Sequence, residues 1–308
     1  MIARPAALLA ITTFVMGAAV VPLPEVTPAR ELKEASRLAR DGDLQADWNK
    51  MLDARAQLQA LVRHKDISAL VHYQLGYLEW RMSALVYLSS GYRGQVTHWR
   101  SAVAELEHAV ALRPDLADAH ALIGLCTTAL LSTDPGQAER LRPRIESAWK
   151  SALDSARTSP RAILLRAMTV FATPPANGGN QTRGLDLWHE AIAQLEKEKI
   201  DDPLAPEWGL AEAWGWLGGA YLMQGEHDKA VPAFERALGL RRDFWWVSRV
   251  AMPQAKRPGQ TTVTGVGQMR GSLERLGVPS VVIEWAVMIW SAIATLAQSV
   301  PLSHAAGG

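Results

Sequence analysis

The chain has 308 residues, and hydrophobic residues make up 48% of them, which suffices for a sizeable core. Lysine and arginine number 32 and aspartate and glutamate 31, so the charge balance gives no support to nucleic-acid binding. The single cysteine, Cys126, excludes an internal disulfide framework and a cysteine-rich zinc site. It lies in the apolar run 121–126, so we expect a buried structural thiol rather than a catalytic one.

The first residues have the pattern of a targeting segment. Arg4 supplies a positive charge, residues 6–16 a short apolar core, and residues 17–19 the small side chains of a cleavage site. We therefore expect a signal peptide over residues 1–19 and a proline-rich leader over residues 20–29. The mature chain would then be exported, in the periplasm or associated with the cell envelope. An uncleaved N-terminal anchor is the alternative.

After the leader, apolar residues recur at intervals of three and four, which predicts helices. A first helix pair is expected over residues 31–40 and 44–63. Asp41-Gly42-Asp43 is interpreted as the turn between them, because the further oxygen ligands of a calcium loop are missing.

Three further helix pairs are predicted on the basis of small residues at helical spacing. The first joins residues 72–76 to 102–114 across a long connection that includes residues 89–94. The second joins residues 120–124, across the turn 133–136, to a second helix that ends at Pro160. The third joins residues 160–171 to a helix that carries Gly184, Trp188 and Ala191.

The connector inside the last of these pairs is rich in proline and glycine. Prolines at residues 174–175 are expected to end the first helix, because proline lacks an N–H group and restricts the residue before it. Gly178-Gly179 permits a turn that side chains would forbid, and Asn180 or Thr182 is expected to cap the second helix.

The most regular unit begins near residue 211. One side of its first helix carries Trp214, Leu217, Gly218 and Tyr221, Gly225 ends that helix, and one side of its second helix carries Ala230, Phe234 and Ala237. This spacing resembles the tetratricopeptide repeat, in which W-x2-L-G-x2-Y is followed by Ala, Phe and Ala in the partner helix. The final proline of that pattern is replaced by Arg242.

The resemblance implies an all-α fold. About five antiparallel helix pairs over residues 30–245 would stack into a right-handed α-solenoid with a concave face. In this family the first helices line an inner groove, and the matching positions are Tyr73, Tyr77, Trp80, Leu125, Met168 and Met223. An apolar and aromatic groove of this kind suits a protein or peptide partner. The alternative is that these residues pack between the repeats.

Two features follow the last repeat. Trp245-Trp246 leads into a tail, residues 246–279, that is expected to be irregular. We interpret these two tryptophans either as a bridge between the array and the tail or as an exposed contact surface. Residues 280–300 are apolar and about long enough to span a membrane. We expect them to form a hydrophobic helix, either a membrane anchor or a cap on the array.

Catalytic patterns are weak. No two of the eight histidines stand three or four residues apart, so no helical metal pair is predicted. Residues 265–271 lack the Lys-Ser/Thr of a phosphate-binding loop, and no G-x-S-x-G motif occurs. We therefore expect neither metal nor cofactor. The leading hypothesis is a non-enzymatic scaffold for protein–protein interaction at the bacterial cell envelope.

Two other functions stay open. The proline-glycine connector at residues 174–179 is similar to those of exported repeat proteins, some of which have a pore or cavity between their helices. This favours a small-molecule or lipid-binding subunit associated with an envelope transporter. The second alternative is an enzyme with a repeat-like shell.

Overall fold

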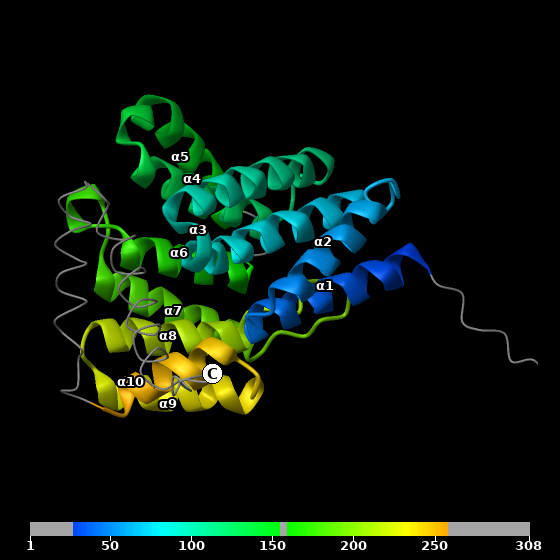
Figure 1. The fold of residues 1–308 in the computed structure, drawn as a ribbon. Helices are drawn as coiled ribbons and strands as arrows, with labels where there is room; N and C mark the ends of the chain where they lie inside the picture. Colours follow the sequence, from blue (N-terminus) through cyan, green and yellow to red (C-terminus); the bar gives the residue numbers. More distant parts are fainter. Residues whose placement is uncertain (1–26, 155–158, 258–308) are drawn as a thin grey trace, which may run out of the picture.

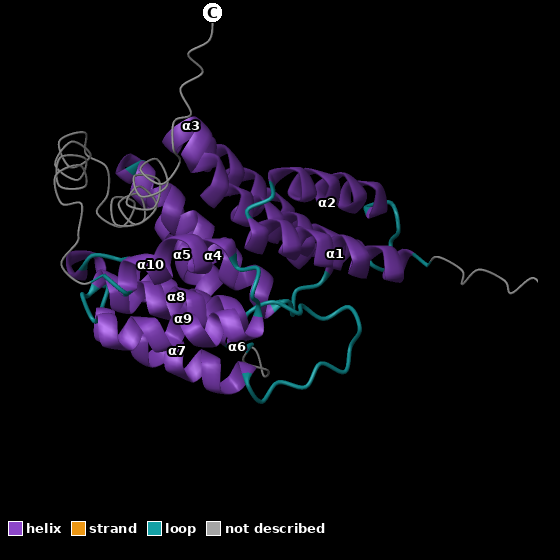
Figure 2. Ribbon diagram, turned by 60° about the horizontal axis from the view of Figure 1, so that its bottom comes forward, coloured by secondary structure: helices purple, strands orange, loops and turns teal. Residues whose placement is uncertain are grey.

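The computed structural model describes residues 27–154 and 159–257. Within these ranges the chain is an all-α helical-repeat solenoid, and neither range contains a strand (Figures 1 and 2). None of the described helices is both long and apolar enough to cross a membrane. The predicted signal peptide, the hydrophobic helix at residues 280–300 and most of the predicted tail lie outside the described residues.

The helices follow one another along the chain and pack mainly on their neighbours. They are α1 (Pro28–Gln45), α2 (Trp48–Leu61), α3 (Ser68–Leu112), α4 (Ala117–Thr133), α5 (Ala138–Leu153), α6 (Pro160–Ala172), α7 (Gln181–Leu195), α8 (Leu210–Met223), α9 (His227–Leu240) and α10 (Met252–Ala255), with short 3₁₀ turns at Pro135–Gln137 and Pro175–Asn177 and a π-helical turn at Val247–Ala251.

Each helix pair contains a glycine that lies against a large side chain of the partner helix. The contacts are Gly42 with Met51, Gly76 with Leu106, Gly124 with Trp149, Gly184 with Phe171, and Gly218 with Phe234. A Cβ atom at Gly218 would lie 2.6 Å from the ring of Phe234, which is too close for carbon atoms in contact. The absence of a side chain therefore lets the two helices approach closely.

The unit at residues 211–237 has the predicted form. Leu217, Ala230, Phe234 and Ala237 are fully buried, and Tyr221 is 9% exposed. Gly225, at φ +76°, ends the turn after α8 in the left-handed conformation. Trp214 is only partly buried, and the guanidinium of Arg236 lies 5.5 Å from its ring centroid.

The first turn is not where we predicted it. Asp41-Gly42-Asp43 lies inside α1, which continues to Gln45. The chain instead turns at Ala46, whose φ is 54°, and Asp47 caps α2 by accepting a hydrogen bond from the amide of Lys50. The expectation was wrong because Gly42 serves the contact with α2 rather than the turn.

Helix α3 doubles back on itself. The imidazole Nδ1 of His72 lies 2.7 Å from a carboxylate oxygen of Glu105, 33 residues along the chain. A straight helix would separate these residues by about 50 Å. The part of α3 around His72 and the part around Glu105 are therefore antiparallel and form the predicted pair. The backbone of residues 89–94 between them is helical rather than a loop, which corrects the predicted long connection.

The middle connectors largely follow the prediction. Helix α5 ends at Leu153 rather than at Pro160, which instead starts α6 after the cap Ser159. After α6, Gly178 has a φ of 88°, and Gly179 lies against the carbonyl of Thr173, so neither position suits a side chain. The side chain of Asn180 accepts a hydrogen bond from the amide of Arg183 and caps α7.

The core continues past the predicted end of the array at residue 245. The ring of Trp246 lies edge-on to Phe234, at a centroid distance of 6.0 Å, and 6.2 Å from Phe244. The chain is helical from there to Ala255, so this part of the expected irregular tail is ordered helix. Of the two interpretations of Trp245-Trp246, these contacts favour a bridge to the array.

Candidate functional site

The predicted groove residues do not line an open groove. Tyr73, Tyr77 and Trp80 are 1%, 2% and 6% exposed. Met168 is also buried, and Leu125 and Met223 are partly buried against the same core. The aromatic members of this set therefore pack inside the molecule, which was the alternative to a binding role.

The connector between α7 and α8, residues 196–209, covers these aromatic residues. The indole N–H of Trp208 donates a hydrogen bond to the hydroxyl of Tyr73 at 2.9 Å. The ring of Trp208 lies 5.0 Å from Tyr77 and 6.2 Å from Trp80, centroid to centroid. Aromatic contacts of this kind stabilise a core beyond the area that they bury. The expectation of an open aromatic groove was wrong because the chain fills this space with its own connector.

Arg161 of α6 anchors this connector. Its guanidinium donates hydrogen bonds to the carbonyl oxygens of Pro206 at 2.6 Å and Trp208 at 2.7 Å, and pairs with the carboxylate of Glu198. Burial alone would lower the pKa of Arg161, but the hydrogen bonds that it donates to Glu198 and the charge of Asp118 raise that pKa above its usual value. The buried guanidinium therefore stays charged and holds two backbone carbonyls in place.

Helix α1 closes over the other side of the connector. Lys33, Arg37 and Arg40 lie on one face of α1. The ammonium of Lys33 lies 3.4 Å from the carboxylate of Glu207, and Arg37 donates a hydrogen bond to that carboxylate at 3.3 Å. Arg40 donates to the backbone carbonyl of Glu207 at 2.8 Å. The side chains of Lys33, Arg37 and Glu207 are 32%, 58% and 36% exposed, so solvent reaches this rim.

Beneath the rim lies a buried ion pair. Arg40 donates two hydrogen bonds to Glu212, at 2.9 and 3.2 Å, and the amide of Gly209 donates a third at 3.0 Å. Burial would raise the pKa of Glu212, but the charge and hydrogen bonds of Arg40 and the backbone donors hold it below its usual value. The carboxylate is therefore ionised and fully satisfied within the protein.

The far end of α1 contacts the end of α9. Asp41 accepts a hydrogen bond from Arg241 at 2.7 Å, and Gln45 donates one to Asp243 at 2.7 Å. We call the set of polar contacts made by Arg37, Arg40, Asp41 and Gln45 the α1 clasp. It ties the first helix to the connector before α8 and to the end of α9.

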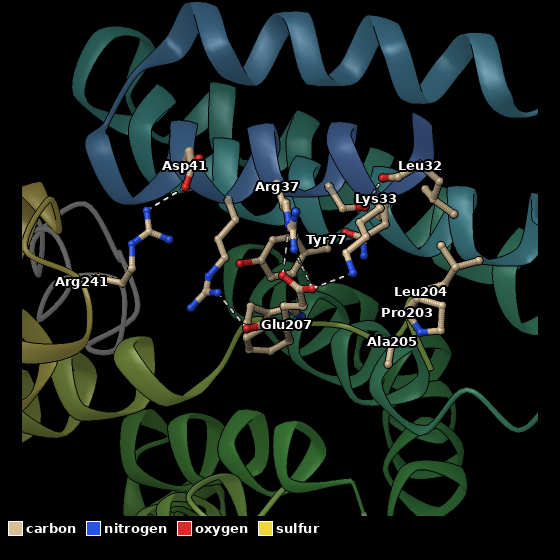
Figure 3. A pocket seen from close by; sticks show the side chains of 14 residues that line it. Leu32, Lys33, Arg37, Asp41, Tyr77, Pro203, Leu204, Ala205, Glu207 and Arg241 are labelled. Carbon is tan, nitrogen blue, oxygen red and sulfur yellow. Dashed lines mark hydrogen bonds and ion pairs between the residues drawn. The ribbon is translucent and has the colours of Figure 1, made fainter. Parts of the chain in front are cut away.

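A cavity of about 210 Å³ lies between α1 and residues 203–208. Figure 3 shows Lys33 and Arg37 directed toward Glu207, and Arg241 directed toward Asp41. The lining residues are Leu32, Lys33, Ser36, Arg37, Arg40, Asp41, Gln74, Tyr77, Pro203, Leu204, Ala205, Glu207, Trp208 and Arg241. Of the predicted groove residues, only Tyr77 lines it.

Neither a metal site nor a reactive thiol is supported in the part of the chain that the structure describes. There, no group of three histidine, cysteine, aspartate or glutamate side chains could hold a metal ion. Cys126 is buried, as predicted, and burial raises the pKa of its thiol well above the usual value. The cavity is therefore the best candidate for a functional site among the described residues.

The prediction from sequence missed most residues of this site. Lys33, Arg37 and Arg40 stand at helical spacing on one face, but charged residues at such spacing usually face solvent. A stronger signal was Trp208, a large aromatic residue in a proline-containing connector. An aromatic residue there indicates that the connector packs against the protein rather than projecting into water.

One family comparison gives a match. Residues 211–244 match the family model described as "Tetratricopeptide repeat". No curated protein and no solved structure is significantly similar to the chain. The match covers α8, α9 and the residues after α9, which is the unit with the most regular spacing. A tetratricopeptide repeat indicates a scaffold for protein–protein interaction.

Proposed function

We propose that this chain, which contains a tetratricopeptide repeat at residues 211–244, is a non-enzymatic scaffold for protein–protein interaction at the bacterial cell envelope. Repeats of this kind stack into extended surfaces that bind other proteins. The five glycine contacts between helices support an array longer than the single matched repeat. The envelope location is supported by the leader pattern of residues 1–19.

The partner-binding face is proposed to be the surface where α1 meets the connector. One observation carries this proposal: Trp208 occupies the space beside Tyr73, Tyr77 and Trp80, so the aromatic surface of the first helices is covered from within. Lys33, Arg37 and Glu207 instead border a cavity, and their side chains are accessible to solvent. A partner with acidic and apolar side chains would complement it.

Affinity capture with charge-reversal variants tests this face. The tagged full chain and the double variant Lys33→Glu/Arg37→Glu are used to capture proteins from the organism that encodes the chain, and the captured proteins are quantified by mass spectrometry. Arg30→Glu is the matched control, since Arg30 is an exposed residue of α1 that does not line the cavity. We expect the double variant to lose partners that the wild type and the control retain. Equal capture by all three would assign binding to another face.

The envelope location has its own test. N-terminal sequencing of the mature protein, after fractionation of cells, should give a start near residue 20. A start at residue 1 in the cytoplasmic fraction would contradict export. The proposed membrane association of residues 280–300 predicts that deleting residues 280–308 moves the protein out of the membrane fraction.

A further inference from the structure

One wall of the cavity between α1 and residues 203–208 carries a buried carboxamide without a partner. Gln74 of α3 lines this cavity and is only 7% exposed. Its side-chain amide makes no hydrogen bond within the part of the chain that the structure describes, yet neither amide atom is fully enclosed by protein. The amide therefore faces the accessible space that the residue lines, which is the cavity. Since buried polar groups nearly always have a partner, this amide indicates a ligand that both donates to it and accepts from it.

The charged groups around the cavity are balanced within the protein. Four cationic side chains line it, and they pair with four carboxylates: Lys33 and Arg37 with Glu207, Arg40 with Glu212, and Arg241 with Asp41 and Asp243. None of these cations is left over for an anionic ligand, and an ion buried without a counter-charge is strongly disfavoured. The ligand that fits this cavity is therefore uncharged.

Another part of the wall is apolar and limits the size of the ligand. It consists of Leu32, Pro203, Leu204, Ala205 and the ring of Trp208. A dry cavity of about 150 Å³ accommodates benzene. The volume here, about 210 Å³, has room for a body of that size with a short polar extension.

The chemistry of a carboxamide restricts the polar extension further. A ligand whose N–H and C=O groups lie on the same side can form two parallel hydrogen bonds with the amide of Gln74. Primary carboxamides and ring lactams have this cis edge, whereas a trans peptide bond directs its N–H and C=O groups to opposite sides. A polypeptide backbone can therefore form at most one of the two bonds.

We propose that this cavity binds a small uncharged molecule in which a cis amide edge is attached to an apolar or aromatic body. The carbonyl of the ligand accepts a hydrogen bond from the amide nitrogen of Gln74, and the N–H group of the ligand donates one to the Gln74 carbonyl oxygen. The body lies against Leu204 and Trp208. This binding function is separate from the proposed scaffold, so it holds whether or not a protein partner binds the same face.

NMR titration of the purified full chain with three probes of nearly equal shape tests the proposal. Benzamide has the cis amide edge, acetophenone replaces its NH₂ group by a methyl group, and benzoate replaces the amide by a charged carboxylate. We expect benzamide to bind with a Kd of about 1 mM or lower. Acetophenone should bind at least about fivefold more weakly because it lacks the donor, which corresponds to about 1 kcal/mol. Benzoate should bind at least about tenfold more weakly, which corresponds to about 1.4 kcal/mol.

A pair of variants locates the binding. Gln74→Leu removes the amide at similar volume and should fold, because that amide makes no hydrogen bond within the described residues. It should lose the preference for benzamide over acetophenone. Gln57→Leu, at an exposed residue of α2 outside the cavity, should keep the preference. Undetectable binding of benzamide, benzoate binding as tight as that of benzamide, or a preference that persists in Gln74→Leu would each overturn the proposal.

Two further probes test the geometry of the edge and separate its two sources. N-methylbenzamide has a trans amide and should bind no more tightly than acetophenone; binding as tight as that of benzamide would refute the cis edge. Isoindolin-1-one is the ring lactam that corresponds to benzamide. Tighter binding of the lactam than of benzamide, lost in Gln74→Leu, assigns a lactam to the site, and the reverse order assigns a primary carboxamide. Either order depends on Gln74 and thus supports the proposal.

Discussion

The helix pairs and the α1 clasp hold this molecule together in different ways. Within a pair, a glycine meets a large apolar side chain a short distance along the chain, as Gly218 meets Phe234. In the clasp, charged groups meet across most of the chain, and Arg40 and Glu212 are 172 residues apart. Local apolar spacing leaves a pattern in the sequence, whereas a long-range ion pair leaves none. The helix pairs could therefore be predicted from the sequence, but the α1 clasp could not.

The largest effect is expected inside a helix pair. Phe234→Ala removes a fully buried ring and leaves a cavity beside Gly218, which should lower the free energy of unfolding by about 3–5 kcal/mol. Urea denaturation followed by circular dichroism measures this change. A loss below 1 kcal/mol would mean that the pair collapses around the missing ring and that its packing is less specific than described.

Breaking the clasp at its buried pair should cost nearly as much. Glu212→Gln leaves Arg40 without its carboxylate, and removing one partner of a buried pair costs about 3–5 kcal/mol. The lower end is expected because 20% of the Arg40 side chain is exposed. The same denaturation experiment at neutral pH measures it, and Glu226→Gln, at a half-exposed carboxylate outside the clasp, is the control.

Acid should reduce the difference between the wild type and Glu212→Gln. The pKa of Glu212 is lower in the folded protein than its ordinary value of 4.5, so its contribution to stability is complete above about pH 4.5. That contribution is lost as the pH falls below this value toward the folded-state pKa, because protons then bind the unfolded state preferentially. Unfolding free energies at pH 7 and pH 3.5 test this, and an unchanged difference between the two proteins would contradict it.

Adding a methyl group should disturb the same helix pair less than removing the ring. Gly218→Ala places a carbon 2.6 Å from the ring of Phe234, and overpacking of this kind costs about 1–3 kcal/mol. Gly239→Ala on α9 is the matched control, because no atom lies within 4 Å of its added carbon. The control should be neutral or stabilising by up to about 1 kcal/mol. Equal effects of the two changes would refute a role for close contact at Gly218.

The smallest effect is expected at the exposed rim of the clasp. Arg37 is 58% exposed, and surface ion pairs contribute about 0–1 kcal/mol. Arg37→Gln should therefore change thermal stability little, with the difference from the wild type shrinking further at high salt. A loss comparable to that of Glu212→Gln would show that the rim and the buried pair act as one unit.

Particular residues show how far the sequence predicts this structure. The connector at residues 174–180 could be read correctly because proline, glycine and asparagine act on the backbone next to them. Gly42 was misread because a glycine that permits a turn and a glycine that permits a helix contact look the same in a sequence. Tyr73, Tyr77 and Trp80 were placed on the first helices, but whether that surface is open depends on a connector more than a hundred residues away.

The clasp changes how the ends of the array behave. In an open stack of repeats, each unit contacts only its neighbours, so the terminal helices open at the lowest cost. Here the first helix is fastened to the units that precede and include the last repeat, through Glu207, Glu212 and Arg241. Local opening of α1 therefore requires breaking these ion pairs as well as its contacts with α2, so we expect the amide hydrogens of α1 to exchange more slowly than those of a terminal helix that lacks such pairs. The first helix of this linear array is thus protected against fraying by residues that follow it by about 170 to 200 positions.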